Sequence, residues 1–330
     1  MKEFTYQKAA DVPGAVALLG ADPEARFLAG GTNLVDLMKS GVERPARLVD
    51  VRELPLNRIQ TTADHGLRIG ATVTNSDLAA HPDVRRRYPV LTQAVLAGAS
   101  GQLRNMATVG GNLLQRTRCA YFTDLTKPCN KRDPGSGCPA IGGEHHNHAV
   151  LGASSHCVAV HPSDMAVALS ALDCVVHYET ADGSGELPIG ELYLPVADTP
   201  HRETALPPGA LITHITLPPS PVAARSRYRK VRERASYAFA IGSIAAALDV
   251  RDGVVHDARV AFGAVASRPW RARAAERVLI GAPAVTEAFG AAADAEMAAA
   301  RPLAHNEYKV TLMRNLTVAV LGELAEEAGR

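Results

Sequence analysis

The sequence predicts an α+β fold with more than one domain. Its 330 residues are roughly twice the usual size of a single domain. Along the first two thirds, short strand signals alternate with helix signals, whereas the last third changes to longer strands followed by alanine-rich helices. Because 47% of the residues are hydrophobic, there is enough apolar material for a core in each domain.

The first unit is expected to alternate strands with helices. An aspartate and a proline mark the start of its first helix, and glycines end both of its helices. In order, the expected elements are a strand at 4–6, a helix at 11–20, a strand at 26–29, a helix ending by Gly41 and a strand at 48–51.

The alternation restarts after a short gap and continues to a proline-rich segment. The expected elements are a strand at 67–73, a helix capped by Asn75 or Ser76, a helix at 83–96, a helix capped by Ser163 that ends near Leu172, and a strand at 174–178. Pro218-Pro219-Ser220-Pro221 is typical of a linker. Beyond it, strands are expected at 227–231, 239–250 and 259–264.

Charge and composition exclude several classes of function. Lysine plus arginine (35) nearly balances aspartate plus glutamate (34), so the field that would attract nucleic acid or an anionic membrane is missing. No 18-residue apolar span and no export signal occurs. We therefore expect a soluble protein without nucleic-acid binding or membrane insertion. The five cysteines are an odd number in a long chain, which makes a disulfide framework the weaker interpretation.

Two glycine pairs form the most informative pattern. In the segment 26–34, Gly30-Gly31 stands where an apolar strand meets a helix start, which lets main-chain N–H groups converge on an anion. A plain strand–turn–helix corner is the alternative. The segment 107–113 repeats the order with Gly110-Gly111, then asparagine and leucine. Two such turns about eighty residues apart suit a ligand with two linked phosphates.

The usual nucleotide motifs are missing, so the diphosphate must be held in another way. Neither G-x-G-x-x-G nor G-x-x-x-x-G-K-[ST] occurs, which argues against a Rossmann unit and a P-loop. Ser163-Asp164 opens a helix after a strand, where the carboxylate would reach a ribose hydroxyl or a flavin edge. Ordinary capping of that helix is the competing interpretation.

Residues 116–157 follow no period and hold four cysteines with four histidines. An irregular stretch of this length is usually functional or disordered, and so many cysteines do not suit disorder, so we expect a ligand to order it. The spacing C-x9-C-x8-C-x18-C matches neither zinc knuckles nor ferredoxin patterns. Two metal centres remain equal alternatives: an iron–sulfur cluster, and a zinc site with His145, His146 or His148 as a ligand. A third interpretation is that the imidazoles simply face solvent.

The residues around the cysteines and the fifth cysteine complete this prediction. Lys127, Lys131, Arg132, Arg116 and Arg118 flank the four cysteines and would offset the negative charge of a metal–thiolate centre. Cys174 lies in the apolar run 172–176, where a buried inert thiol is the ordinary explanation. It is therefore left out of the site.

Four ordered motifs carry a family resemblance: FLAGGTNL, GQLRNMATVGGNL, HPSDMA and KVRERASYAFA. Together they resemble the FAD-binding subunit of molybdenum hydroxylases, a family that includes xanthine dehydrogenases and carbon monoxide dehydrogenase. The resemblance implies a two-part FAD-binding domain of the vanillyl-alcohol-oxidase type at 1–221, with subdomains at about 1–54 and 55–221. It also implies an iron–sulfur insertion at about 116–158 and a C-terminal α+β domain at 222–330.

Carried over by motif position, the resemblance implies the residues that hold FAD. They are Leu28, Ala29, Gly30, Gly31, Thr32, Asn33, Leu34, Gly101, Thr108, Gly110, Gly111, Asn112, Asp164, Leu211, Ile212 and Lys230. Lys230 lies in a basic run, so a solvated strand edge is its alternative. The segment RTRCAYFTDLTKPCNKRDPGSGC is similar to the flavoprotein subunit of periplasmic-type aldehyde oxidoreductases. That likeness implies one 4Fe-4S cluster on Cys119, Cys129, Cys138 and Cys157.

The resemblance further implies an electron-transfer subunit that does not turn over the organic substrate alone. Its expected partners are a molybdenum cofactor subunit and a 2Fe-2S subunit, in a heterotrimer or a dimer of heterotrimers. The resemblance leaves two compartments open: the cytoplasm, or the periplasm if a signal-bearing partner exports the folded chain. The alternatives are a xanthine dehydrogenase or 4-hydroxybenzoyl-CoA reductase subunit, a stand-alone flavin oxidase or reductase, and a zinc-stabilised scaffold.

Overall fold

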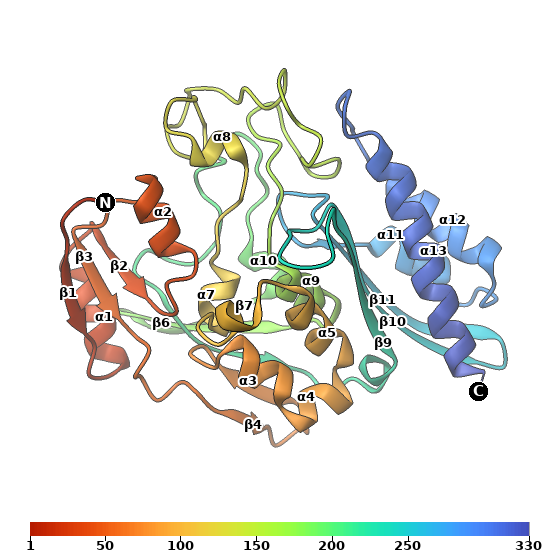
Figure 1. Ribbon diagram of the computed structural model, residues 1–330. Coiled ribbons are helices and arrows are strands. Elements are labelled where there is room, and N and C mark those ends of the chain that lie inside the picture. Colours follow the sequence, from red (N-terminus) through yellow and green to blue (C-terminus); the bar gives the residue numbers. More distant parts are fainter. Residues whose placement is uncertain (330) are drawn as a thin grey trace.

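The computed structural model describes residues 1–329, which form three sheets with their helices (Figure 1). The N-terminal sheet is parallel, in the order β1-β3-β2. Its elements are β1 (Thr5–Lys8), α1 (Val12–Gly20), β2 (Ala25–Leu28), α2 (Leu34–Ser40) and β3 (Arg47–Asp50). The Asp11 side chain caps α1 by accepting from the Gly14 N–H, and Gly41 ends α2 at φ 79°. The elements expected in this unit are confirmed to within a few residues.

The central sheet has the order β4-β5-β8-β6-β7, and every neighbouring pair is antiparallel. Its strands are β4 (Ile59–Thr61), β5 (Leu67–Gly70), β6 (Val175–Thr180), β7 (Gly183–Pro188) and β8 (Leu211–Leu217). The associated helices are α3 (Asn75–Ala80), α4 (Pro82–Arg87), α5 (Pro89–Ala97), α6 (Gly101–Arg104), α7 (Val109–Leu113), α9 (Asp164–Ala171) and α10 (Ile189–Leu192). The apolar faces of α5 and α9 supply much of the core over this sheet.

Two helix predictions in the central unit were wrong in detail. The single helix expected at 83–96 is divided into α4 and α5, because Pro89 disfavours helical geometry at Tyr88, whose φ is −137°. The cap of α3 is Thr74, whose side chain accepts from the Asp77 N–H, and not Asn75 or Ser76. The α9 prediction is confirmed, since the Ser163 hydroxyl accepts from the Ala166 N–H.

The C-terminal sheet is antiparallel, in the order β12-β11-β10-β9, and three helices cover one face. Its elements are η1 (Pro221–Ala224), β9 (Ser226–Val231), β10 (Gly242–Arg251), β11 (Val254–Gly263), β12 (Trp270–Arg271), α11 (Arg273–Leu279), α12 (Thr286–Met297) and α13 (Tyr308–Ala328). The expected linker leads directly into η1, where Val222 and Ala223 are buried, so it is no free spacer. The strand expected from 239 starts only at Gly242.

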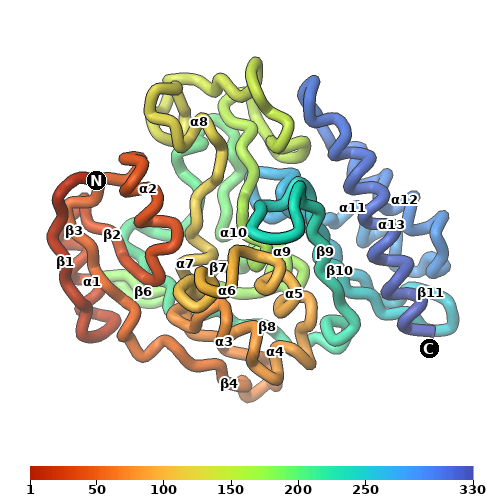
Figure 2. The backbone as a smooth tube through the Cα atoms, in the orientation of Figure 1, coloured from red at the N-terminus to blue at the C-terminus, as the bar shows by residue number. Residues whose placement is uncertain are grey.

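The irregular segment 116–160 lies at the top of the view in Figures 1 and 2, between the N-terminal unit and α13. Its helix α8 (Ala120–Thr123) is a single turn. Lys309, buried at the start of α13, donates to the main-chain oxygens of Asn147 (3.0 Å) and Ala264 (2.8 Å). Burial lowers the pKa of Lys309 to about 7. His145 and His148 are buried as well, so the interpretation that the imidazoles face solvent was wrong for both.

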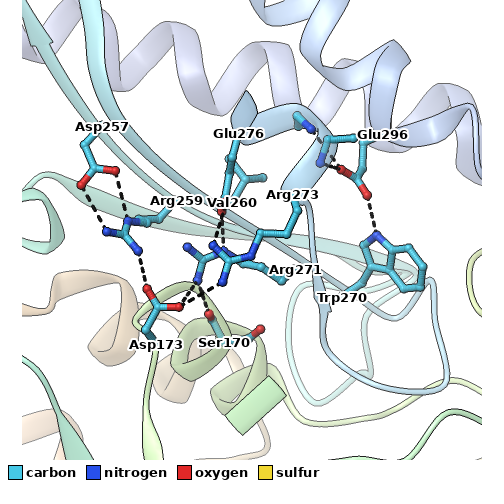
Figure 3. Close-up of polar contacts among 12 residues, drawn as sticks. Ser170, Asp173, Asp257, Arg259, Val260, Trp270, Arg271, Arg273, Glu276 and Glu296 are labelled. Atoms are coloured by element: carbon cyan, nitrogen blue, oxygen red, sulfur yellow. Dashed lines mark hydrogen bonds and ion pairs between the residues drawn. The ribbon is translucent and has the colours of Figure 1, made fainter. Parts of the chain in front are cut away.

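Figure 3 shows a cluster of ion pairs that joins the central and C-terminal units. Asp173, which follows α9, pairs with Arg259, Arg271 (3.0 Å) and Arg273 (3.4 Å) of the C-terminal unit. Arg271 also donates to the main-chain oxygen of Ser170. The cluster therefore anchors the end of α9 to the C-terminal sheet.

We expect Asp173→Asn to lower the free energy of unfolding by about 1 kcal/mol, since pairs of partly exposed charges contribute little more. The Asp173 side chain is 40% exposed, and Arg271 keeps its bond to Ser170. Urea unfolding of the variant measures the loss. Asp182→Asn, on the exposed turn between β6 and β7, is the matched control and should leave the midpoint unchanged. Equal midpoints for both variants would show that the cluster adds nothing.

No helix within residues 1–329 combines the length and the hydropathy that a membrane span requires.

Candidate functional site

A cavity of about 1210 Å³ lies where the three units meet. Its wall takes residues from the loops after β2 and α6, from the start of α9, from β8 and β9, and from the loop between β9 and β10. These segments are far apart in the sequence, and Figure 2 shows them converging around the centre of the molecule. The fold therefore builds one site from all three units.

The two glycine turns touch each other inside this cavity. A side chain on Gly30 would place its Cβ 1.9 Å from the main-chain oxygen of Met106, just before the second turn. Gly31 has φ 71°, in the left-handed region that glycine adopts without strain. The Asn33 side chain accepts from the Arg116 N–H at 2.9 Å and fixes the first turn to the chain beyond the second. Both turns thus face the same ligand space.

Most residues predicted to hold a cofactor line this cavity. They are Ala29, Gly30, Gly31, Thr32, Asn33, Leu34, Thr108, Gly110, Gly111, Asn112, Asp164, Leu211, Ile212 and Lys230. Leu28 and Gly101 are not in the wall: Leu28 ends β2 opposite Asp50, and Gly101 begins α6. The assignment of each residue to a cofactor atom stays a prediction.

A buried polar cluster occupies the wall at the start of α9. Asp164 accepts from Lys230 Nζ at 2.7 Å and from the Tyr228 hydroxyl at 2.5 Å, and Lys230 also donates to the main-chain oxygen of Ala97 at 3.2 Å. Burial, with the charge of Asp164, raises the pKa of Tyr228 well above its usual range. The Lys230 side chain is only 4% exposed, so the solvated strand edge was the wrong alternative.

Tyr228 was missed by the sequence reasoning, although a signal for it existed. Side chains alternate between the two faces of a strand, so Tyr228 and Lys230 share one face of β9. Arg227 and Arg229 point to the other face, where both pair with Glu323 of α13. A tyrosine two residues before a lysine that is assigned to a cofactor site is therefore a candidate for the same site.

The cavity fits an extended, partly polar ligand. Pockets for drug-sized molecules hold roughly 300–1,000 Å³, so this cavity has room for a dinucleotide. Five residues of its wall each carry a buried polar side-chain atom without a hydrogen-bond partner among the described residues: Thr72, Asn75, His148, His161 and Ser243. Burial lowers the pKa of His161 to about 3, so its imidazole is neutral.

The four cysteines of the irregular segment surround one small void beside the cavity. Cys119, Cys129, Cys138 and Cys157 all line it, and none of them forms a disulfide. A hydrogen bond from the Cys157 thiol lowers the pKa of Cys138. Within residues 1–329, no three cysteine, histidine or acidic side chains have the geometry of a metal site. The thiols are thus close together without being arranged around an ion.

Cys119 lines both the void and the cavity. Its sulfur lies 3.2 Å from Nε2 of the buried His148. Burial raises the pKa of Cys119 and lowers that of His148 to about 4. A centre held by these cysteines would therefore lie directly behind the cavity wall.

Two of the cations expected to offset a metal–thiolate centre are already paired. Lys131 donates to Glu203 at 2.7 Å, and Arg116 pairs with Glu203 and Glu43, each at 2.7 Å. Burial alone would raise the pKa of Glu203, but Lys131 and Arg116 lower it overall. For these two residues the structure indicates a role in fixing the irregular segment to the N-terminal and central units.

Comparison with known proteins identifies the family. A model described as the FAD binding domain in molybdopterin dehydrogenase matches residues 2–220, and one described as the CO dehydrogenase flavoprotein C-terminal domain matches residues 212–324. The chain belongs to the FAD-binding subunits of the molybdenum hydroxylases. It is thus an FAD-binding oxidoreductase subunit, which confirms the family and fold predicted from the four motifs.

Relatives within this family extend over the whole chain. The aldehyde oxidoreductase FAD-binding subunit PaoB of Escherichia coli (strain K12) is 51% identical over 330 residues, which is 99% of this chain and 100% of the relative. The putative xanthine dehydrogenase FAD-binding subunit XdhB of the same organism is 26% identical over 98% of this chain and 97% of its own. A carbon monoxide dehydrogenase structure from Hydrogenophaga pseudoflava superposes with TM-score 0.77, at 25% identity, over 99% of this chain and 98% of that one.

Proposed function

We propose that this FAD-binding subunit belongs to a molybdenum-dependent aldehyde oxidoreductase and passes electrons from iron–sulfur clusters to an external acceptor. The observation that carries the proposal is the 51% identity, over essentially the whole chain, to an aldehyde oxidoreductase FAD-binding subunit. The other relatives quoted above are much less similar. The proposed partners are a molybdenum cofactor subunit and a 2Fe-2S subunit, in a heterotrimer or a dimer of heterotrimers.

In this proposal the chain positions FAD and supplies no general acid or base. Bound FAD takes up electrons singly and releases them in pairs, which links one-electron centres to a two-electron acceptor. The first glycine turn would hold the diphosphate through its main-chain N–H groups. The N–H groups of Gly110 and Gly111 donate to the Ala71 main-chain oxygen and to the Thr108 hydroxyl, so the second turn would contribute close approach without side chains. Leu211 and Ile212 would hold the ring system from the cavity wall, and Lys230, held by Asp164, would supply a cation to it.

Co-purification of the chain from its native source tests the proposal. We expect molybdenum and further iron to accompany it, and an aldehyde to bleach the flavin absorbance of the complex. The isolated FAD-loaded chain should not be reduced by the same aldehyde. Turnover of an organic substrate by the chain alone would favour a stand-alone flavin enzyme instead.

We further propose that Cys119, Cys129, Cys138 and Cys157 hold one 4Fe-4S cluster. Two structural observations support this: the four cysteines converge on a single void, and none of them forms a disulfide. The likeness of the segment RTRCAYFTDLTKPCNKRDPGSGC to periplasmic-type aldehyde oxidoreductases is the third argument. Cysteine thiolates are the usual ligands of such clusters. Binding the cluster would require the four thiols to separate from their positions around the void.

For this cluster, Cys129→Ser is expected to remove most of the bound iron from the purified chain, because one of four ligands is lost. Cys174→Ser is the matched control: Cys174 is fully buried in the central core, and burial raises the pKa of its thiol. Iron content by elemental analysis and the iron–sulfur absorbance measure both variants. Unchanged iron in Cys129→Ser would refute the ligand assignment, and zinc in place of iron would support the scaffold alternative.

A further inference from the structure

Arg118 is a cation of the cavity wall without a carboxylate partner. The other cations of the wall have a partner or contact solvent. Arg116 and Lys230 form close ion pairs, and Arg26 approaches Glu43 at 3.9 Å. Arg234 is exposed. Arg118 is partly buried, and no carboxylate of the described residues lies within ion-pair distance of it. Among residues 1–329, its guanidinium donates only to the main-chain oxygen of Arg116.

The position of Arg118 is defined on two sides. The bond between Asn33 and the Arg116 N–H holds this stretch of chain against the first glycine turn. On the other side, the guanidinium lies over the ring of Phe239, 5.0 Å from its centroid, in the loop between β9 and β10. Arg118 therefore leaves a stretch of chain that is fixed to the first glycine turn, and its guanidinium reaches the loop between β9 and β10 in the cavity wall.

The environment of this guanidinium is unfavourable without an anion. The Arg118 side chain is partly buried, and among the described residues the one hydrogen-bond partner of its guanidinium is the main-chain oxygen of Arg116. A partly desolvated guanidinium has few ways to recover the lost hydration, and arginine forms its strongest bonds with planar or tetrahedral oxyanions. The remaining donors of Arg118 are thus suited to phosphate oxygens.

We infer that Arg118 binds the diphosphate of FAD and makes the site selective for the dinucleotide over phosphate-free flavin. The inference rests on the FAD-binding role of the chain and on no part of the cluster proposal. The two glycine turns line the cavity but carry no charge, whereas a diphosphate is negatively charged. Arg118 supplies the missing positive charge.

The test compares FAD and riboflavin binding to the full-length chain after removal of its flavin. Arg118→Gln should weaken FAD binding at least ten-fold, which corresponds to about 1.4 kcal/mol, and leave riboflavin binding unchanged. Arg118→Lys should restore part of the FAD affinity because it keeps the charge. Arg85→Gln, on an exposed position of α4, is the control and should bind both flavins as the parent does. Quenching of flavin fluorescence gives the affinities.

Each other outcome overturns the inference. Unchanged FAD affinity in Arg118→Gln would mean that the charge serves another anion, and an equal loss for both flavins would place Arg118 at the ring system. If Arg118→Gln does not fold, Arg118→Lys and Phe239→Leu are measured in its place. Phe239→Leu removes the stacked ring but keeps the charge of Arg118, so the inference requires that this variant still binds FAD in preference to riboflavin. A parent chain that binds neither flavin would contradict the proposed function itself.

Discussion

Gly30→Ala is expected to abolish FAD binding and to lower the free energy of unfolding by about 3 kcal/mol, at the upper end of overpacking effects. The new Cβ would lie 1.9 Å from the main-chain oxygen of Met106 and 2.5 Å from its carbon. Neither atom belongs to a flexible side chain, so the two turns must separate. Because both turns line the cavity, a separation removes the geometry that holds the ligand.

Two further variants distinguish folding from binding in this experiment. Gly20→Ala, at the end of α1 with no atom within 4 Å of the added Cβ, should be neutral or slightly stabilising. Gly111→Val places a side chain between the turns, 3.8 Å from Ala29, and should weaken FAD binding with a smaller loss of stability. Urea unfolding and FAD titration measure all three. Normal FAD affinity in Gly30→Ala would show that the turns do not act together.

The glycine turns could be predicted from the sequence because their requirement is local. The first turn needs a strand, two residues without side chains and a helix start, and all three signals occur within a few residues. The second pair lies in the first turn of α7, whose cap is Thr108. The helices capped by Asp11 and Ser163 were predicted for the same reason. Fold class followed from the order of such local signals, together with the motifs that the family shares.

The polar partners inside the site could not be predicted from the sequence, because they depend on tertiary contacts. Asp164 and Tyr228 are separated by 64 positions, and they meet because α9 packs against β10 and β11, with β9 paired to β10. The same holds for Arg116, whose partners Glu43 and Glu203 come from two other units. Their charges looked free in the sequence and are paired in the fold.

The cysteine segment could be predicted from the sequence only in part. Spacing alone left zinc and iron–sulfur open, since ligand geometry is not encoded in the intervals between distant cysteines. The fold shows that the four thiols approach one another although almost no regular structure connects them. Contacts from Lys131 and Lys309 hold the segment. Lys131 was expected from the sequence to offset a metal centre, and Lys309 was not singled out.

Lys230→Met is expected to lower the free energy of unfolding by about 3–5 kcal/mol, the range found when one member of a buried ion pair is removed. Lys230 and Asp164 have side chains that are 4% and 8% exposed, so solvent screens the pair weakly. Methionine keeps the apolar stem but leaves the Asp164 charge with Tyr228 as its remaining side-chain partner. Urea unfolding of the flavin-free chain measures the loss.

The double variant Lys230→Met/Asp164→Asn separates charge from packing. Because it removes both charges and keeps an acceptor for Tyr228, it should recover at least half of the stability lost in Lys230→Met. If the free energy of unfolding of Lys230→Met lies within about 1 kcal/mol of the parent value, the ion pair is exposed to solvent in solution. FAD titration then addresses function: if Lys230 lies beside the bound ring system, the folded double variant binds FAD more weakly than the parent. Equal affinity would leave this pair a purely structural role in the cavity wall.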